Sequence, residues 1–129
     1  MWSKKVHVES SLKRKQGQYS LFIGRWQPLH IGHKALFQQV LDEGGNVCIA
    51  IRDVEPDEKN PFSPKDVLAN ICLEYQELIS RGRVRVIVVP DICSVEFGRG
   101  VGYDIIEHIP PTEIGDISAT KIREQMKKL

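Results

Sequence analysis

Residues 19–33 read YSLFIGRWQPLHIGH, and the interpretation of the whole chain starts from them. The apolar run Tyr19–Ile23 predicts a buried strand, which stops at Gly24. A short loop follows, and apolar residues then recur at helical spacing, which predicts a helix. These recurring residues are Ile31, Leu36, Phe37, Val40 and Leu41.

Two histidines lie three residues apart at the predicted helix start. Residues at this spacing face the same side of a helix, so His30 and His33 can contact one ligand. The first helical turn also offers unpaired backbone N–H groups and the positive end of the helix dipole. Gly32 lets a ligand approach the backbone closely, and Gly24 and Arg25 lie beside it. Together these residues predict a phosphate site; the flanking sequence disfavours the alternative of two ordinary surface histidines.

Length and composition indicate one soluble globular domain over residues 1–129. Hydrophobic residues make up 41% of the chain and charged residues 27%, which is ordinary for such a domain. A net charge of +1 gives no argument for binding nucleic acid or a membrane surface. No apolar run approaches a membrane span, and residues 1–5 lack a signal-like apolar core. Residues 1–18 are polar and basic, which indicates a solvated N-terminal arm.

The cysteines indicate a reducing compartment. Cys48, Cys72 and Cys93 lie inside apolar runs, are odd in number, and show no metal-ligand spacing. Buried free thiols are the natural explanation, and we therefore expect a cytoplasmic protein.

A second apolar strand, residues 46–51, follows the first helix after Gly44–Gly45. Strand, helix and strand over about 30 residues predict a right-handed βαβ unit with parallel strands. Such sheets bind ligands at the carboxyl ends of their strands, where Gly24 and Arg52 both fall. Arg52, expected immediately after the second strand, is therefore a candidate phosphate contact.

The middle of the chain predicts a loop, one helix and further strands. Lys59 lies in the polar loop 53–60 and is a candidate phosphate contact. The expected helix is capped by Ser63 and ends at Arg81–Gly82. A strand is expected over residues 84–89 and a weak strand over 103–109. The glycine-dense residues 98–102 favour a turn, with a flexible loop at the site as the alternative.

The segment ISATKIR, residues 117–123, predicts a second helix start. Ser118 can cap it, Thr120 lies in the first turn, and Arg123 follows one turn later. Hydroxyl, free N–H groups and guanidinium at a helix start form a second candidate anion site, with an ordinary capped helix as the alternative.

Residues 24–33 resemble the first signature of the nucleotidyltransferase superfamily, which includes cytidylyltransferases and nicotinamide mononucleotide (NMN) adenylyltransferases. The opening Gly-Arg-x-Gln-Pro is most similar to the archaeal type of NMN adenylyltransferase, with Trp26 in place of the usual phenylalanine. Segments 60–63 and 89–92 also resemble that type, and residues 117–123 resemble the second signature.

The resemblance implies an α/β fold, a Rossmann-like three-layer sandwich with a mostly parallel five-stranded sheet. It also implies roles for individual residues. His30 and His33 would stabilise the α- and β-phosphates as pyrophosphate leaves, while Gly24 and Gly32 give backbone access. The remaining phosphate contacts would come from Arg25, Ser118, Thr120 and Arg123, and candidate substrate contacts are Trp26, Arg52 and Lys59. Magnesium is expected, bound chiefly through the phosphates and not by a protein carboxylate cage.

The implied reaction moves the nucleotidyl group of a nucleoside triphosphate to a phosphate-bearing small-molecule acceptor and releases pyrophosphate. Such an in-line displacement needs positioning and charge stabilisation, which a site of His, Arg, Ser and Thr can supply. The archaeal-like segments favour ATP. However, only about 25 residues separate Asp91 from Ser118, where the archaeal enzymes have a longer region that holds much of the base and acceptor pocket.

Two alternatives therefore stay open: a cytidylyltransferase acting on a small phosphorylated alcohol, and a nucleotide-binding module without turnover. The chain has neither Gly-x-x-x-x-Gly-Lys nor Gly-x-Gly-x-x-Gly after the first strand, which disfavours a P-loop enzyme or a dinucleotide-binding oxidoreductase. Members of the family are often homo-oligomers, so association of this small domain is compatible with the resemblance.

Overall fold

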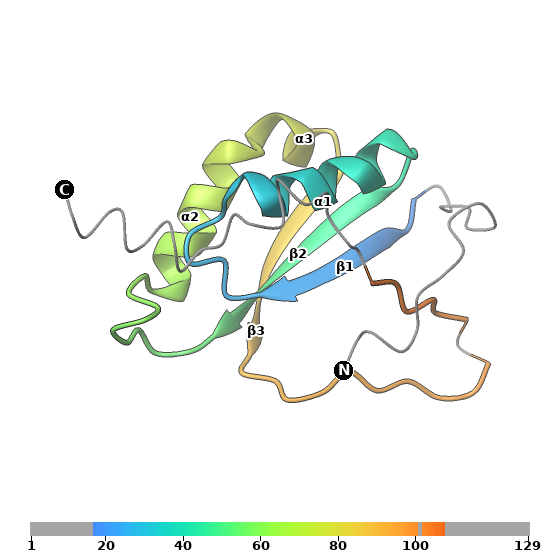
Figure 1. The fold of residues 1–129 in the computed structure, drawn as a ribbon. Coiled ribbons are helices and arrows are strands. Elements are labelled where there is room, and N and C mark those ends of the chain that lie inside the picture. The colour runs from blue at the N-terminus through green and yellow to red at the C-terminus, as the bar shows by residue number, and fades with distance from the viewer. Residues whose placement is uncertain (1–16, 101, 108–129) are drawn as a thin grey trace.

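Three parallel strands in the order β1-β2-β3 form the sheet of the protein in a computed structural model, which describes residues 17–100 and 102–107. The helices α1, α2 and α3 lie on one face of this sheet (Figure 1). The elements in chain order are β1 Tyr19–Gly24, α1 Ile31–Asp42, β2 Asn46–Asp53, α2 Pro64–Glu74, α3 Gln76–Ser80 and β3 Val84–Pro90.

The predicted βαβ unit is confirmed. β1 pairs with β2 in parallel from Tyr19 opposite Asn46 to Gly24 opposite Ile51. β2 pairs with β3 in parallel as far as Asp53 opposite Pro90. The carboxyl ends of the three strands therefore meet at one edge of the sheet, where ligands bind in folds of this kind.

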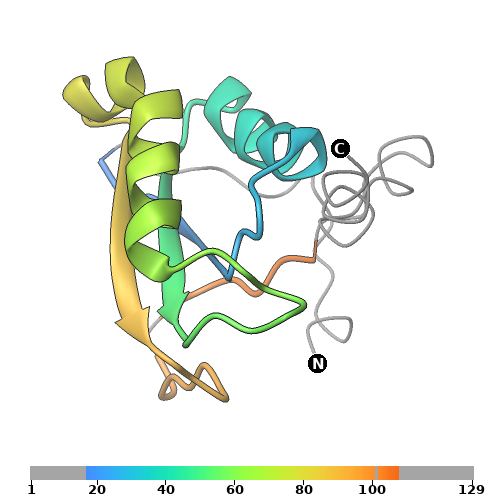
Figure 2. The same ribbon diagram turned by 90° about the vertical axis from the view of Figure 1, so that its left-hand side faces the viewer.

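The hydrophobic core lies between the sheet and the helices (Figure 2). Alternate residues of β2 point toward the helices because successive side chains of a strand face opposite sides. Phe37 of α1 is fully buried, and burial of such a side chain contributes about 1.5–3 kcal/mol. The buried core residues are Trp26, Phe37, Val40, Leu41, Val47, Ile49, Ile51, Val67, Ile71 and Val84.

The predicted helix over residues 63–81 is two helices. Its start is as expected: the Ser63 hydroxyl accepts a hydrogen bond from the Asp66 N–H at 3.1 Å, and Pro64 is the first helical residue. At Tyr75 the backbone leaves helical angles (φ −112°, ψ 19°), and α2 ends there. The Tyr75 ring packs edge-on against Phe37, with 6.1 Å between centroids, so a core contact coincides with the break.

Other sequence expectations need correction. β2 runs to Asp53, so Arg52 lies inside the end of the strand and not after it, because the pairing with β3 continues that far. The described residues contain three of the five expected strands. Residues 103–107 form no strand, since no neighbouring strand pairs with them, and 108–109 lie outside the described part. A turn occurs at Arg99–Gly100, where Gly100 has φ +84°.

The cysteines are free thiols, as predicted, but they are less buried than expected. Cys48 and Cys72 are partly buried, and Cys93 is exposed because it lies beyond the end of β3. Among the described residues, no helix combines the length and apolarity needed to cross a membrane. Ser118, Thr120 and Arg123 lie outside the described residues, as does most of the N-terminal arm.

Candidate active site

The candidate site begins where β1 ends at Gly24, at the carboxyl edge of the sheet. The loop after Gly24 leads directly into α1, whose N-cap is His30 in extended conformation (φ −136°, ψ 176°). His33 is the third residue of the same helix. The prediction that both histidines lie at a helix start is therefore confirmed, and Gly32 is buried between them.

The two imidazoles cap the helix reciprocally. The Gly32 N–H donates to His30 Nδ1 at 3.0 Å, and the His30 N–H donates to His33 Nδ1 at 3.2 Å. This is a capping box in which imidazole nitrogens replace the usual hydroxyl and carboxylate oxygens. A ring nitrogen that accepts a hydrogen bond carries no proton, so each neutral ring holds its proton on Nε2. Both histidines thus carry an N–H group at Nε2.

Burial keeps these rings neutral. The imidazoles stack with 3.6 Å between centroids and 21° between planes. Burial, with a smaller contribution from the neighbouring His30, lowers the pKa of His33 to about 4. Burial also lowers the pKa of His30. At neutral pH the helix start therefore presents two uncharged N–H donors beside the positive end of the helix dipole.

The Trp26 side chain packs against His33, the second histidine of the pair. Its indole is only 9% exposed and meets the His33 ring edge-on, with 4.9 Å between centroids. The indole Nε1–H donates to the Ala50 carbonyl at 3.0 Å. A Cβ at Gly24 would lie 3.1 Å from the indole, a tight contact that the ring could accept only by moving a few tenths of an ångström. The sequence predicted a substrate contact here; the indole contacts His33, and that prediction stays open.

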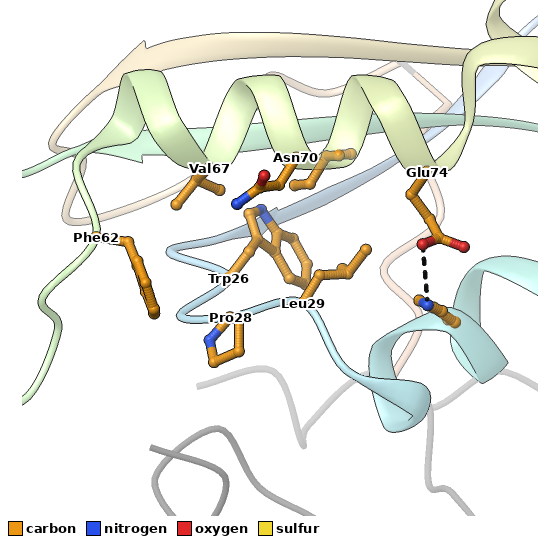
Figure 3. A pocket seen from close by; sticks show the side chains of 9 residues that line it. Trp26, Pro28, Leu29, Phe62, Val67, Asn70 and Glu74 are labelled. Carbon is orange, nitrogen blue, oxygen red and sulfur yellow. Dashed lines mark ion pairs between the residues drawn. The ribbon is translucent and has the colours of Figure 1, made fainter. Parts of the chain in front are cut away.

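Trp26 also lines a cavity of about 210 Å³ between α1, α2 and the loop that joins β1 to α1. Figure 3 shows the indole at its centre, with Phe62 and Val67 to one side. An ion pair between Lys34 and Glu74, 3.3 Å apart, lies at the other end.

The predicted arginine contacts are paired with carboxylates of neighbouring loops. Arg25 donates to the Glu55 carbonyl at 3.2 Å and lies 3.8 Å from the Asp57 carboxylate. Arg52 donates to Asp91 at 2.6 Å, while its buried Nε has no hydrogen-bond partner within the part of the chain that the structure describes. Hydrogen bonds from the Asn60 backbone lead the interactions that lower the pKa of Asp57, and Arg25 contributes to the same shift.

The structure brings together five of the expected residues that it describes, while Arg52 and Lys59 belong to neighbouring segments. Gly24, Arg25, His30, Gly32 and His33 share one end of β1 and the start of α1. Arg52 is the next-to-last residue of the neighbouring strand, and Lys59 lies in the turn whose backbone N–H groups bond Asp57. No group of three or more His, Cys, Asp or Glu side chains in the described ranges is placed to hold a metal ion.

Sequence reasoning missed the role of Gln27. Its side-chain amide donates to the Phe62 carbonyl at 2.8 Å and accepts from the Phe62 N–H at 2.9 Å. It is 5% exposed, the one buried polar residue of the described part. Its place inside the Gly-Arg-x-Gln-Pro segment was the available signal, but a partner 35 residues away cannot be read from spacing.

Part of the chain is similar to known proteins. Residues 21–66 match the family model described as cytidylyltransferase-like. This segment holds the end of β1, the histidine pair and the start of α2, and the predicted resemblance to the nucleotidyltransferase superfamily is confirmed over it. The parallel α/β arrangement is consistent with that fold.

Individual relatives carry adenylyltransferase names. Over 67 residues the chain is 37% identical to the nicotinamide/nicotinic acid mononucleotide adenylyltransferase of Acinetobacter baylyi, covering 47% of this chain and 36% of the relative. It is 33% identical over 75 residues to the nicotinamide-nucleotide adenylyltransferase of Thermococcus sibiricus, covering 56% and 40%. The Pyrococcus furiosus protein of the same name is 33% identical over 76 residues, with the same coverage. The match thus spans about two fifths of each relative's length, and the likeness to archaeal proteins is confirmed.

Proposed function

We propose that the chain is a nucleotidyltransferase that moves the adenylyl group of ATP to a phosphate-bearing small-molecule acceptor and releases pyrophosphate. The observation that carries this proposal is the reciprocal cap of His30 and His33. It leaves two Nε2–H donors at a helix start on the ligand-binding edge of a parallel sheet. The family match and the names of the relatives support the same reaction class.

The histidine donors suit the charge that develops during the transfer. An acceptor phosphate oxygen forms a bond to the α-phosphorus while the bond from that phosphorus to the bridging oxygen breaks, and pyrophosphate departs with the electron pair. Negative charge grows on the bridging oxygen and is shared by the phosphoryl oxygens. Donors fixed by backbone caps need not reorganise as this charge grows, which is the condition for strong electrostatic stabilisation.

The arginines can exchange their carboxylate partners for phosphate. The pairs of Arg25 with Asp57 and Arg52 with Asp91 are partly exposed. Such pairs contribute only about 0–1 kcal/mol, so a triphosphate or an acceptor phosphate can displace the carboxylates at small cost. In the proposal Arg25 then contacts the triphosphate, and Arg52 and Lys59 contact the substrate phosphate. Ser118, Thr120 and Arg123 would complete the triphosphate site from the second predicted helix start.

We expect Mg²⁺ to bind together with the nucleotide. Mg²⁺ prefers phosphate and water oxygens and usually binds through few protein ligands. It would neutralise part of the phosphate charge, while the side chains of this chain orient the triphosphate and donate hydrogen bonds to it.

A pyrophosphate-release screen tests the proposal. Each of the four ribonucleoside triphosphates is combined with Mg²⁺ and with NMN or one of a panel of phosphorylated alcohols and sugars. Release that requires ATP and NMN, or ATP and another phosphorylated acceptor, supports adenylyl transfer. Release that requires CTP and a phosphorylated alcohol supports a cytidylyltransferase, the alternative that the cytidylyltransferase-like family model favours. Tight nucleotide binding without release under any pairing would replace both with a binding module.

Two variants control the screen. His33→Ala removes one Nε2–H donor and should abolish most of the release. Gln38→Ala changes an exposed residue of the same helix, whose amide bonds Asp42 at 2.8 Å, and should leave the release unchanged.

A further inference from the structure

Three consecutive side chains tie the loop after β1 to β2 and to the segment that follows β2. Arg25 donates to the carbonyl of Glu55 at 3.2 Å, Trp26 to that of Ala50 at 3.0 Å, and Gln27 to that of Phe62 at 2.8 Å. Ala50 lies inside β2, whereas Glu55 and Phe62 lie between β2 and the start of α2. We call residues 25–27 the tether, since this tripeptide connects the histidine-bearing loop to β2 at one point and to the loop after β2 at two points.

Gln27 makes the strongest of the three connections. Both halves of its amide are used, the donor on the Phe62 carbonyl and the acceptor on the Phe62 N–H, at 2.8 and 2.9 Å. Phe62 directly precedes Ser63, the N-cap of α2, so the amide links the start of α1 to the start of α2. Gln27 is buried, so a carbonyl or N–H group left without a partner there would lower the stability of the fold.

The hydrogen bonds of the tether also determine the position of Trp26, its middle residue. Its φ of +52° falls in the left-handed region, which side-chain-bearing residues seldom adopt. Such a conformation persists only where the surroundings enforce it. The bonds of Trp26 to Ala50 and of Gln27 to Phe62 supply that enforcement, and the indole held in this way meets the edge of His33.

We propose that Gln27 is a positioning residue for the histidine pair: its amide, acting through Trp26, sets the place of the His33 ring relative to the loop 54–62. This rests on the proposed function. The Gln27 amide bonds the Phe62 backbone, and it acts on the His33 ring through Trp26. Its loss therefore shifts a donor that stabilises the transition state while leaving the donor's chemistry intact.

Gln27→Met is the first test, because methionine fills a similar volume without either hydrogen-bonding group. We expect kcat for pyrophosphate release to fall about 10- to 100-fold, the effect of displacing a catalytic group by about 1 Å. KM for the nucleotide should stay within about threefold, as expected when an interaction of the transition state alone is lost. Ser63→Ala is the matched control: it removes the cap of α2 at the same junction, so it should lower the melting temperature yet keep kcat within about twofold.

Gln27→Glu separates positioning from general destabilisation. A carboxylate accepts from the Phe62 N–H but cannot donate to the Phe62 carbonyl, whereas a protonated carboxyl does both. Burial raises the pKa of a carboxyl group, so the variant should regain kcat as pH falls from 8 to 5.5. The charged and titratable groups nearby are Arg25, His30, His33, Lys34, Glu55 and Asp57. The kcat of each variant is divided by the wild-type kcat at the same pH, which cancels the contributions of these groups that both proteins share. For Gln27→Met this ratio should not change with pH.

Tryptophan emission gives a readout that needs no turnover. The chain has two tryptophans, so Trp2→Phe leaves Trp26 as the sole emitter. In that background Gln27→Met should shift the Trp26 emission to longer wavelength as the indole gains contact with water, and Ser63→Ala should not.

The outcomes separate this inference from the proposed function. An active wild type with a Gln27→Met variant of near-normal kcat would overturn the positioning role alone. A wild type that releases no pyrophosphate under any pairing would overturn the proposed function. In that case unchanged emission of Trp26 in Gln27→Met would also overturn the structural coupling, and a shifted emission would support it.

Discussion

His33→Gln should remove a pH dependence of folding stability that the wild-type chain carries. In the folded chain, burial above all lowers the pKa of His33 from 6.5 to about 4. An unfolded histidine titrates near 6.5. As pH falls through 6.5, His33 therefore becomes protonated in the unfolded chain, whereas in the folded chain it stays neutral until about pH 4. The contribution of neutral His33 to the free energy of unfolding is fully present above pH 6.5 and is lost as pH falls toward 4.

The size of the effect follows from this pKa difference. Between 6.5 and pH 5.0 lie about 1.5 pH units, each equivalent to 1.36 kcal/mol, which sets a ceiling of about 2 kcal/mol on the loss. Because the imidazole is only partly buried, solvent screening reduces this figure, and we expect about 1 kcal/mol. Glutamine keeps an acceptor at the third helical position, where it serves in ordinary capping boxes, so the bond from the His30 N–H can survive without the titration.

Urea unfolding at pH 7.5 and pH 5.0 measures the difference. The wild type should lose about 1 kcal/mol more stability than His33→Gln between the two conditions. The carboxylates are common to both chains, so their titrations cancel in the comparison. His30 is also common to both, and the small part of its titration that does not cancel comes from its contact with His33, which the substitution removes. Gln38→Ala, on the exposed face of the same helix, should behave as the wild type. Equal losses in the wild type and His33→Gln would refute the assignment of a buried, neutral His33.

The remaining predictions concern the same site. His33→Ala should lower kcat for pyrophosphate release, because loss of one donor to developing charge raises the activation free energy by about 2–4 kcal/mol. A near-normal kcat would count against the role of His33. Gly24→Ala should destabilise the fold by about 1–3 kcal/mol in thermal unfolding, because the new Cβ would lie 3.1 Å from the Trp26 indole. Arg123→Lys should lower kcat/KM about tenfold in the release assay because the planar guanidinium fork is lost, whereas full activity would remove Arg123 from the proposed site.

Local sequence patterns predicted the elements that position the site. Apolar runs and turn residues located β1, α1 and β2, and the spacing of His30 and His33 placed both rings at one helix start. These features depend on contacts between residues close in sequence, and such contacts leave a periodic signature. The parallel pairing followed from the length of the crossover and the fixed handedness of such units.

Long-range contacts could not be predicted in the same way. The bond between Gln27 and Phe62 joins residues 35 apart, and that between Trp26 and Ala50 joins residues 24 apart. The break at Tyr75 interrupts a helical pattern that has no proline or glycine at that point. In each case tertiary contacts decide which bond forms or where the helix ends. The sequence shows only which chemical groups are present to make those contacts.

The reciprocal cap limits which chemistry the histidines can perform. To become an imidazolium, either ring would need a proton on Nδ1, which already faces a backbone N–H at 3.0 or 3.2 Å. Charging a ring therefore breaks a cap bond in addition to overcoming burial, and both effects keep the rings neutral. Neutral donors hold a ground-state triphosphate less strongly than cations would, yet they still stabilise charge that grows during the reaction. The cap of α1 and the proposed catalysis thus depend on the same two nitrogens, and a substitution that keeps Nε2 but loses the Nδ1 bond should impair both.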